Sequence, residues 1–341
     1  MWAIHQRDCK MKIAFYSPHM SERGTETAMY DFAHYNEEIL QNDSIILYND
    51  NNPANHPTVI EKFNKRFPGK VFALKGPDFN FAWQAEYTNP LIDEVLSEQE
   101  CDILYMQKGG RNDGVYSHIC KNIILCCSNH HEPHGDAYLY VSKWLSDMLS
   151  NGATPYIPII IDLPKGLGNM REDLSIPEDA VVMGRTGGLD TWDIPWANRS
   201  IEKALSLRED LYFVFQNTPR IFDHDRVKYI KTTADNNFKS KFIETCDAMI
   251  HCRLNGESFG QSCAEFSFMN KRVITYANSK ERAHIEMLKE KGLYYKNENE
   301  LLTILMGFTP DNKGDWNCYK QHSPKIVMKK FAEIIKSVMK E

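Results

Sequence analysis

Two glutamates, Glu257 and Glu265, lie on either side of a Ser-Phe-Gly turn, with seven residues between them. The residues before the turn are typical of a buried strand, and those after Gly260 of the start of a helix. The first amides of a helix have no acceptors inside it and attract an anion such as phosphate. A carboxylate repels phosphate, so each glutamate is expected to accept hydroxyl groups at the sides of the anion. A nucleotide sugar has this layout, with sugar hydroxyls on one side of its diphosphate and ribose hydroxyls on the other.

A purely structural interpretation of the two glutamates stays open beside this one. Glu257 would cap the helix that follows, because acidic side chains are favoured near a helix N-terminus. Glu265 would form a salt bridge on the protein surface.

Further polar groups follow two strands of the N-terminal half. The segment 128–136, SNHHEPHGD, holds three histidines and two acids close to Cys126 and Cys127. Its spacing matches no standard zinc pattern, and Pro133 bends it away from helical ligand geometry. We therefore expect no metal in this loop. The residues themselves leave open whether His130, His131 or His134 faces a ligand or the loop is purely solvated.

Lys108 and Arg111 follow another buried strand, in the segment YMQKGGRNDG. Both are candidate contacts for an acceptor substrate. A turn with solvated charges explains them equally well.

These residues are carried by short apolar strands that alternate with helices. Such strands predict parallel sheets covered on both faces, and hence an α/β protein with two doubly wound, Rossmann-like domains facing each other across a cleft. The expected strands of the first half are Lys12–Ser17, Ser44–Tyr48, Lys70–Leu74, Asp102–Met106, Asn122–Cys127 and Ala137–Ser142. Those of the second half are Ala180–Arg185, Tyr212–Gln216, Val227–Ile230, Ala248–Cys252 and Arg272–Tyr276.

The segment 154–166 holds three prolines and a short apolar run that we expect to be a strand in the connection between the domains. We place an N-terminal extension at 1–10, the first domain at 11–162, the second at 163–322 and a C-terminal amphipathic helix at 323–341.

Composition narrows the function classes. The chain has 341 residues and a formal charge of −6, which argues against a general nucleic-acid binder. No apolar run approaches the length of about 20 residues that spans a bilayer, although peripheral membrane contact stays open. Nine cysteines, mostly inside apolar segments, suggest reduced thiols and a cytoplasmic protein.

The segment around Glu257 and Glu265 resembles the E-x7-E signature of retaining glycosyltransferases with the GT-B fold, particularly glycosyltransferase family 4. Other stretches resemble the same family in the same order along the chain. They are KIAFYSPHMSERGTETAMYDFA near the N-terminus, YLYVSKWLSDML, YIPIIID and VMGRTGGLD. In this fold the C-terminal helix often crosses back to the first domain. The resemblance also implies that the first domain binds the acceptor and the second the nucleotide-sugar donor.

The resemblance implies a hexosyltransferase that moves a sugar from a UDP- or GDP-sugar to a glycan or other hydroxyl acceptor, with retention. Glu257 would contact the donor sugar and Glu265 the ribose, and His131 would be a functional histidine facing the cleft. The diphosphate would be held by a larger set of groups. These are Arg185, the amides of Phe259, Gly260 and Gln261, and, from the first domain, Gly24 and Thr25. No cofactor or metal is required.

The chain departs from the family pattern in one respect. Members usually carry a lysine a few residues after the arginine, but here none precedes Lys203. Either Arg199 or another loop supplies the charge, or the enzyme is slow or inactive. The alternatives are therefore a nucleotide-sugar epimerase on the same fold and a non-catalytic protein that binds nucleotide sugar or glycan.

Overall fold

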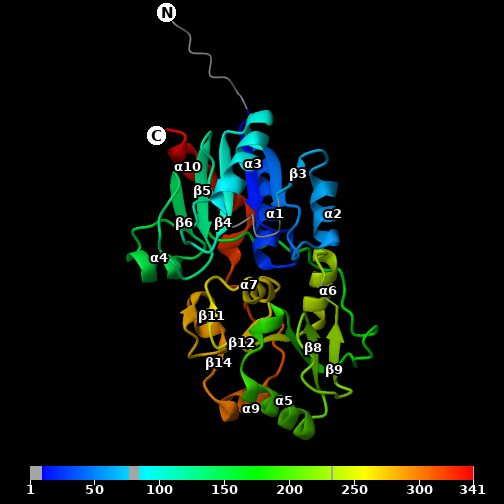
Figure 1. Cartoon of the computed structure of the whole chain (residues 1–341). Helices are drawn as coiled ribbons and strands as arrows, with labels where there is room; N and C mark the ends of the chain where they lie inside the picture. Colours follow the sequence, from blue (N-terminus) through cyan, green and yellow to red (C-terminus); the bar gives the residue numbers. More distant parts are fainter. Residues whose placement is uncertain (1–9, 77–83, 232, 341) are drawn as a thin grey trace, which may run out of the picture. The chain divides into compact units, whose positions relative to one another are not determined.

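The computed structural model describes residues 10–76, 84–231 and 233–340, drawn in colour in Figure 1. Of the N-terminal extension predicted over residues 1–10, only Lys10 is therefore described. The chain forms two compact units. The first contains the residues up to Val141, Ser146–Ile160 and the helix that starts at Pro324. The second contains Ser142–Leu145 and Ile161–Ser323.

The first unit is built on a parallel six-stranded sheet with the order β3-β2-β1-β4-β5-β6. Its strands are β1 Lys12–Ser17, β2 Asp43–Asn49, β3 Val71–Leu74, β4 Ile103–Lys108, β5 Lys121–Cys126 and β6 Ala137–Tyr140. Its helices are α1 Gly24–Glu38, α2 Pro57–Arg66, α3 Ala85–Glu98, α4 Lys143–Ser150, whose first residues group with the second unit, and α10 Pro324–Val338.

The C-terminal helix α10 packs in the core of the first unit, next to α1 (Figure 1). Phe331 of α10 contacts the rings of Phe32 on α1 and Tyr105 on β4, with centroids 5.3 and 5.4 Å apart. Phe32 and Tyr105 are themselves 5.3 Å apart, so the three buried rings form one cluster. Burying such a cluster is a large part of what stabilises this unit.

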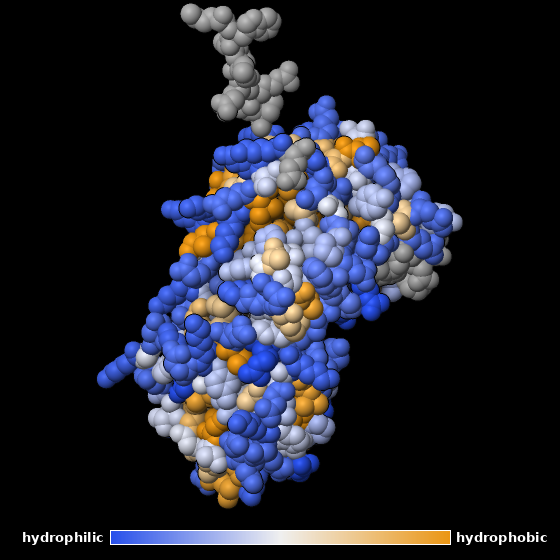
Figure 2. All heavy atoms as spheres, turned by 90° about the vertical axis from the view of Figure 1, so that its left-hand side faces the viewer, coloured by the Kyte–Doolittle hydropathy of each residue, from blue (hydrophilic) through white to orange (hydrophobic). Residues whose placement is uncertain are grey.

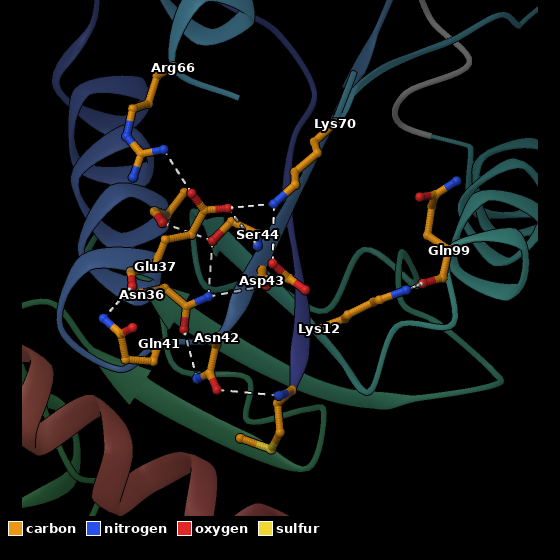
Figure 3. A network of polar contacts seen from close by, with 12 residues as sticks. Lys12, Asn36, Glu37, Gln41, Asn42, Asp43, Ser44, Arg66, Lys70 and Gln99 are labelled. Carbon is orange, nitrogen blue, oxygen red and sulfur yellow. Dashed lines mark hydrogen bonds and ion pairs between the residues drawn. The ribbon is translucent and has the colours of Figure 1, made fainter. Parts of the chain in front are cut away.

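A polar network joins the amino ends of β2 and β3 to the end of α1 (Figure 3). Glu37 accepts hydrogen bonds from Arg66 at 2.7 Å and from Lys70 at 2.9 Å, and Lys70 also lies 3.2 Å from Asp43. Burial opposes the ionisation of Glu37, but its bonds to Lys70 and Arg66 lower the pKa of the carboxyl below its usual value. The network lies at the edge of the sheet opposite the carboxyl ends of the strands, and ligands of such sheets bind at the carboxyl ends. We therefore interpret the network as stabilising the fold rather than binding a ligand.

The second unit repeats the plan, with a parallel sheet of order β14-β12-β10-β7-β8-β9. Its strands are β7 Val181–Arg185, β8 Leu211–Gln216, β9 Val227–Ile230, β10 Ala248–His251, β12 Arg272–Tyr276 and β14 Leu293–Tyr295. A separate two-stranded sheet pairs β11 Gly256–Glu257 with β13 Glu281–Arg282. The helices are α5 Pro195–Leu207, α6 Asn236–Thr245, α7 Gln261–Phe268, α8 Ala283–Leu288 and α9 Glu298–Gly307, with 3₁₀ turns at Leu189–Thr191, Lys289–Lys291 and Lys320–His322.

Alternate residues of β7 face different helix layers, as expected for a sheet covered on both sides. Val181 and Met183 join the core formed with α5 and α9. Gly184 faces the other layer, where an added Cβ would lie 2.9 Å from Phe266 of α7. The expected α/β fold class with two doubly wound domains is confirmed.

Two local expectations differ from the structure. The apolar run in 154–166 forms no strand and makes only an isolated bridge between Tyr140 and Tyr156, because its prolines cannot donate to a ladder. The edge strand β14 was not expected.

The face of the molecule shown in Figure 2 is mostly hydrophilic, with apolar residues in separate groups. Within the described ranges, no helix combines the length and the apolar character that crossing a bilayer requires.

Candidate functional site

Glu257 is placed by a tight turn at the carboxyl edge of the second sheet. The chain leaves β10 at His251, forms the short strand β11 and enters α7 at Gln261. Gly256 has φ +75°, and a Cβ there would collide with the carbonyl oxygen of Glu281 on β13. Only glycine permits the left-handed conformation and the close strand pairing together, so this residue fixes the point at which Glu257 projects.

The carboxylate of Glu257 contacts two basic side chains. His251 Nε2 lies 3.1 Å from Oε1, and Arg253 Nη1 lies 2.9 Å from Oε2. Burial opposes ionisation, but the hydrogen bond from His251 and the electrostatic effects of His251 and Arg253 lower the pKa of Glu257 to about 2. Glu257 is therefore an anion at neutral pH and acts only as an acceptor. Its side chain is 20% exposed, which leaves part of the carboxylate accessible.

The helix α7 begins directly after Glu257. Its N-cap is Gly260, with φ +87°, where a Cβ would lie 3.0 Å from the Cβ of His284 and 3.1 Å from that of Glu257. No acidic residue lies in the first turn of α7. The partial positive charge of this terminus therefore has no anionic side chain of its own to balance it. Phe259, Gly260 and Gln261 lie where the sequence predicts an anion.

Glu265 lies one turn into α7 and is buried, with 4% of its surface exposed. Its Oε1 is 2.7 Å from Lys239 Nζ on α6 and 3.1 Å from Gln261 Nε2. The salt bridge offered as the structural alternative therefore exists, but it is buried rather than on the surface. Within the described part of the chain no donor reaches the buried Oε1 of Gln261, so this amide oxygen is an open acceptor beside Glu265.

Arg185 ends β7 and is 3% exposed. Its guanidinium donates to the carbonyl oxygens of Asn217 and Gly188, at 2.6 and 2.8 Å, and to the hydroxyls of Thr218 and Thr191, at 2.6 and 2.7 Å. All four acceptors are uncharged, and burial lowers the pKa of Arg185 to about 10. Arg185 thus holds together the loops after β7 and β8, while Glu257 is close enough to favour its charge.

Arg199, which could have supplied the charge of the absent lysine, is not one of the cations beside the two glutamates. Arg199 lies on the exposed side of α5, where it pairs with Glu298 at 2.7 Å, so it does not join the site. The cations beside the two glutamates are Arg253 and Lys239, neither of which we expected from the sequence. Arg253 precedes Glu257 by four residues, and this spacing in the sequence could have indicated that the two side chains pair. Lys239 lies 26 residues before Glu265, and no local pattern links the two.

Five expected site residues belong to the first unit, at the carboxyl edge of its own sheet. Gly24 and Thr25 begin α1, and Thr25 Oγ1 donates to the buried carboxylate of Glu26 at 2.9 Å. Ser17 and Ser21 donate to the same carboxylate. The N-terminus of α1 therefore already has an acidic side chain in its first turn, unlike that of α7.

The other three are His131, Lys108 and Arg111. His131 is exposed, and its Nδ1 lies 2.5 Å from the hydroxyl of the buried Tyr140. Lys108 is folded into its own loop, with Nζ 2.5 Å from both Asp113 Oδ1 and the carbonyl oxygen of Val115, and burial lowers its pKa. Arg111 is exposed.

The histidine-rich loop 128–136 shows no arrangement of ligands for a metal. Across the described ranges, no three His, Cys, Asp or Glu side chains are grouped so as to hold an ion. His134 Nδ1 instead contacts the carbonyl oxygen of Glu132 at 2.7 Å.

Comparison with solved structures places the whole chain beside known proteins. It is similar to a glycosyltransferase from Rickettsia africae, with 15% identity, a TM-score of 0.70 and coverage of 97% of this chain and 99% of the other. It is similar to HepE from Anabaena, solved in complex with UDP-glucose, with 14% identity, a TM-score of 0.69 and coverage of 96% and 100%. A putative UDP-N-acetylglucosamine 2-epimerase from Listeria monocytogenes also matches, with 15% identity, a TM-score of 0.64 and coverage of 97% of both chains.

No protein-family model and no curated protein matches the sequence. At these identities the structural likeness shows the fold, and the chain has the GT-B architecture of two Rossmann-like domains found in glycosyltransferases.

Proposed function

We propose that the protein is a retaining glycosyltransferase, similar to family 4, that transfers a hexose from a nucleotide sugar to a hydroxyl acceptor in glycan biosynthesis. The observation that carries the proposal is the ionised Glu257 beside the N-terminus of α7, whose first turn holds no acidic residue, with Glu265 one turn further on. Glu257 accepts hydroxyls of the sugar, the amides of residues 259–261 bind the diphosphate, and Glu265 accepts hydroxyls of the ribose. HepE, which has the same fold, was crystallised with UDP-glucose, which supports UDP as the nucleotide.

Lys239 supplies the positive charge that the sequence lacks after Arg185. Its ammonium group and the amide of Gln261 meet at the same oxygen of Glu265, so Lys239 lies close to the start of α7. When a diphosphate arrives, Lys239 remains paired with Glu265 on one side and offers its other hydrogens to the phosphate. Stabilising the leaving diphosphate with fixed charges and amides is the main contribution that such an enzyme makes, and it needs no metal.

The open oxygen of Gln261 fits the same ligand. A buried acceptor without a donor costs free energy, and a ribose hydroxyl would satisfy it. Glu265 has remaining lone pairs beside it, so the two residues together suit a pair of neighbouring hydroxyls.

Isothermal titration with UDP, GDP and UDP-glucose tests the proposal. We expect UDP to bind in the micromolar range, to bind at least about tenfold more weakly in Glu265→Gln because a hydrogen bond to a charged group is lost, and to bind unchanged in the matched surface variant Arg199→Met. Turnover with UDP-glucose and an acceptor panel, followed by NMR of the anomeric proton, tests transfer and retention. The proposal fails if neither nucleotide binds and no sugar nucleotide raises the temperature of unfolding.

An epimerase is the second candidate, because two structures titled UDP-N-acetylglucosamine 2-epimerase match nearly the whole chain with a TM-score of 0.64. Incubation with UDP-N-acetylglucosamine alone separates the two. An altered sugar without any acceptor indicates epimerisation, whereas transfer requires the acceptor. Tight binding without turnover of any donor would instead indicate a non-catalytic binding protein.

A further inference from the structure

A chain of buried hydrogen bonds ends on the carboxylate of Glu257. His251 Nδ1 lies 2.8 Å from Thr275 Oγ1, and Thr275 Oγ1 lies 3.0 Å from His284 Nε2. Since His251 Nε2 lies 3.1 Å from Glu257 Oε1, the four side chains form one continuous series. His251 and Thr275 are direct partners on the neighbouring strands β10 and β12, and His284 comes from α8.

The three members of the series behind Glu257 are buried. Thr275 and His284 are completely buried, and His251 is 7% exposed. Each hydrogen in it must therefore find an acceptor within the protein, because an unpaired buried donor is costly.

The free end of the series fixes its direction. Within the described part of the chain His284 Nδ1 is buried and has no partner. If that nitrogen carried the hydrogen, a buried donor would be left unsatisfied. If it is bare, the nitrogen is an acceptor without a donor, and the hydrogen on Nε2 is satisfied by Thr275. We take this second arrangement, in which His284 donates to Thr275 and Thr275 in turn donates to His251 Nδ1.

His251 then has one hydrogen, on Nε2, and that hydrogen points at the ionised Glu257. Burial, together with the neighbouring His251, lowers the pKa of His284 to about 3, in agreement with a neutral ring. Arg282 on β13 and Arg253 in the loop after β10 lower this pKa further, and Glu257 opposes the shift.

We infer that His284, Thr275 and His251 form a one-way hydrogen-bond relay that orients Glu257 to accept two neighbouring hydroxyls of a bound sugar. His251 occupies one lone pair of Oε1, and Arg253 occupies one of Oε2. A carboxylate has about four lone-pair positions, so one remains on each oxygen. Two acceptors that are side by side and held still match a vicinal diol. His251 is thus a positioning residue, and this role rests on the proposed function.

Ring-nitrogen NMR of the ¹⁵N-histidine-labelled full chain tests the relay without any ligand. We expect both rings to carry their hydrogen on Nε2 at about pH 8, above the ordinary pKa of histidine. Thr275→Val, which removes the hydroxyl while keeping the shape, should abolish the preference of His251 for this form. The buried threonine at the end of α6 provides the matched control, Thr245→Val. A hydrogen on Nδ1 of either ring under these conditions overturns the relay.

Titration with UDP and UDP-glucose tests whether the relay positions Glu257 to bind the sugar. The ratio of the two dissociation constants measures what the sugar adds to binding. We expect this ratio to fall about tenfold in His251→Phe and to be largely restored in His251→Gln, whose amide nitrogen replaces Nε2 as the donor. Binding of UDP itself should not change in either variant. An unchanged ratio in His251→Phe refutes the positioning role, whereas absent binding of both ligands to the wild type refutes the proposed function and leaves the NMR result to decide on the relay.

Discussion

Lys239 Nζ lies 2.7 Å from Glu265 Oε1 in a pair whose side chains are 15% and 6% exposed. Removing one partner of such a buried pair leaves the other charge without compensation. We expect Lys239→Met to lower the free energy of unfolding by about 3 kcal/mol and to weaken UDP binding. The double variant Lys239→Met/Glu265→Gln should recover part of the stability but none of the binding. Denaturant unfolding and calorimetry of the same samples measure both, and a double variant as unstable as the sum of the single ones would contradict a direct pair.

The stability of the second unit should depend on the charge of Glu257. Its pKa is about 2 in the folded protein against an ordinary value of 4.5. Since the folded pKa is the lower one, the stabilisation is complete above about pH 5 and disappears as the pH falls through 4.5 to 2. Its full size is about 3 kcal/mol, from the free energy that each pH unit represents. Urea unfolding of the wild type and of Glu257→Gln between pH 2 and 6 should give curves that converge at the acidic end. Parallel curves would show that Glu257 is not held as an anion.

Gly260 should be intolerant of any side chain. An alanine there adopts an unfavourable backbone conformation and also presses against His284 and Glu257. Gly166 is a matched control, because it has φ +74° but open space around it. We expect Gly166→Ala to cost about 1 kcal/mol and Gly260→Ala to cost about twice that or more, with loss of UDP binding only in the latter. Equal losses of stability would mean that the contact with His284 is not tight.

The network of Figure 3 should make the first unit sensitive to acid and to salt. The partners of Glu37 lower its pKa, so its contribution is present at neutral pH and is lost as the pH falls through the folded value. We expect Glu37→Gln to cost about 1 kcal/mol at pH 7 in low salt, and less in high salt. Glu61→Gln, exposed on α2, serves as the control. Thermal unfolding at two ionic strengths measures the difference, and a cost unaffected by salt would argue for packing rather than charge.

The strands could be predicted from the sequence because they are apolar on both faces. Lys12–Ser17, Val227–Ile230 and Arg272–Tyr276 have the boundaries that were expected. The three-residue strand β14 was missed, since a short run of mixed character gives no periodic signal. The helix after it did carry a signal, because the side chain of Asn297 accepts from the amide of Glu300 at 3.0 Å in the pattern of a capping box.

The candidate site was predictable only as far as it is local in the sequence. Glu257, Gly260 and Glu265 lie within one turn and one helix, so their relation follows from spacing. Lys239 and Thr275 reach the site through strand order and helix packing, which a single sequence does not specify. The pairing of His251 with Thr275 becomes evident only when β10 and β12 are known to be neighbours.

The aromatic cluster of the first unit joins distant parts of the polypeptide, since Phe331 of α10 packs against Phe32 of α1. Ribosomes synthesise a chain from its N-terminus onward. The apolar interior of the first unit therefore stays partly uncovered until all of Ile161–Ser323 and then α10 have been translated. A truncation that removes α10 would leave this interior exposed, and the truncated chain should depend on chaperones.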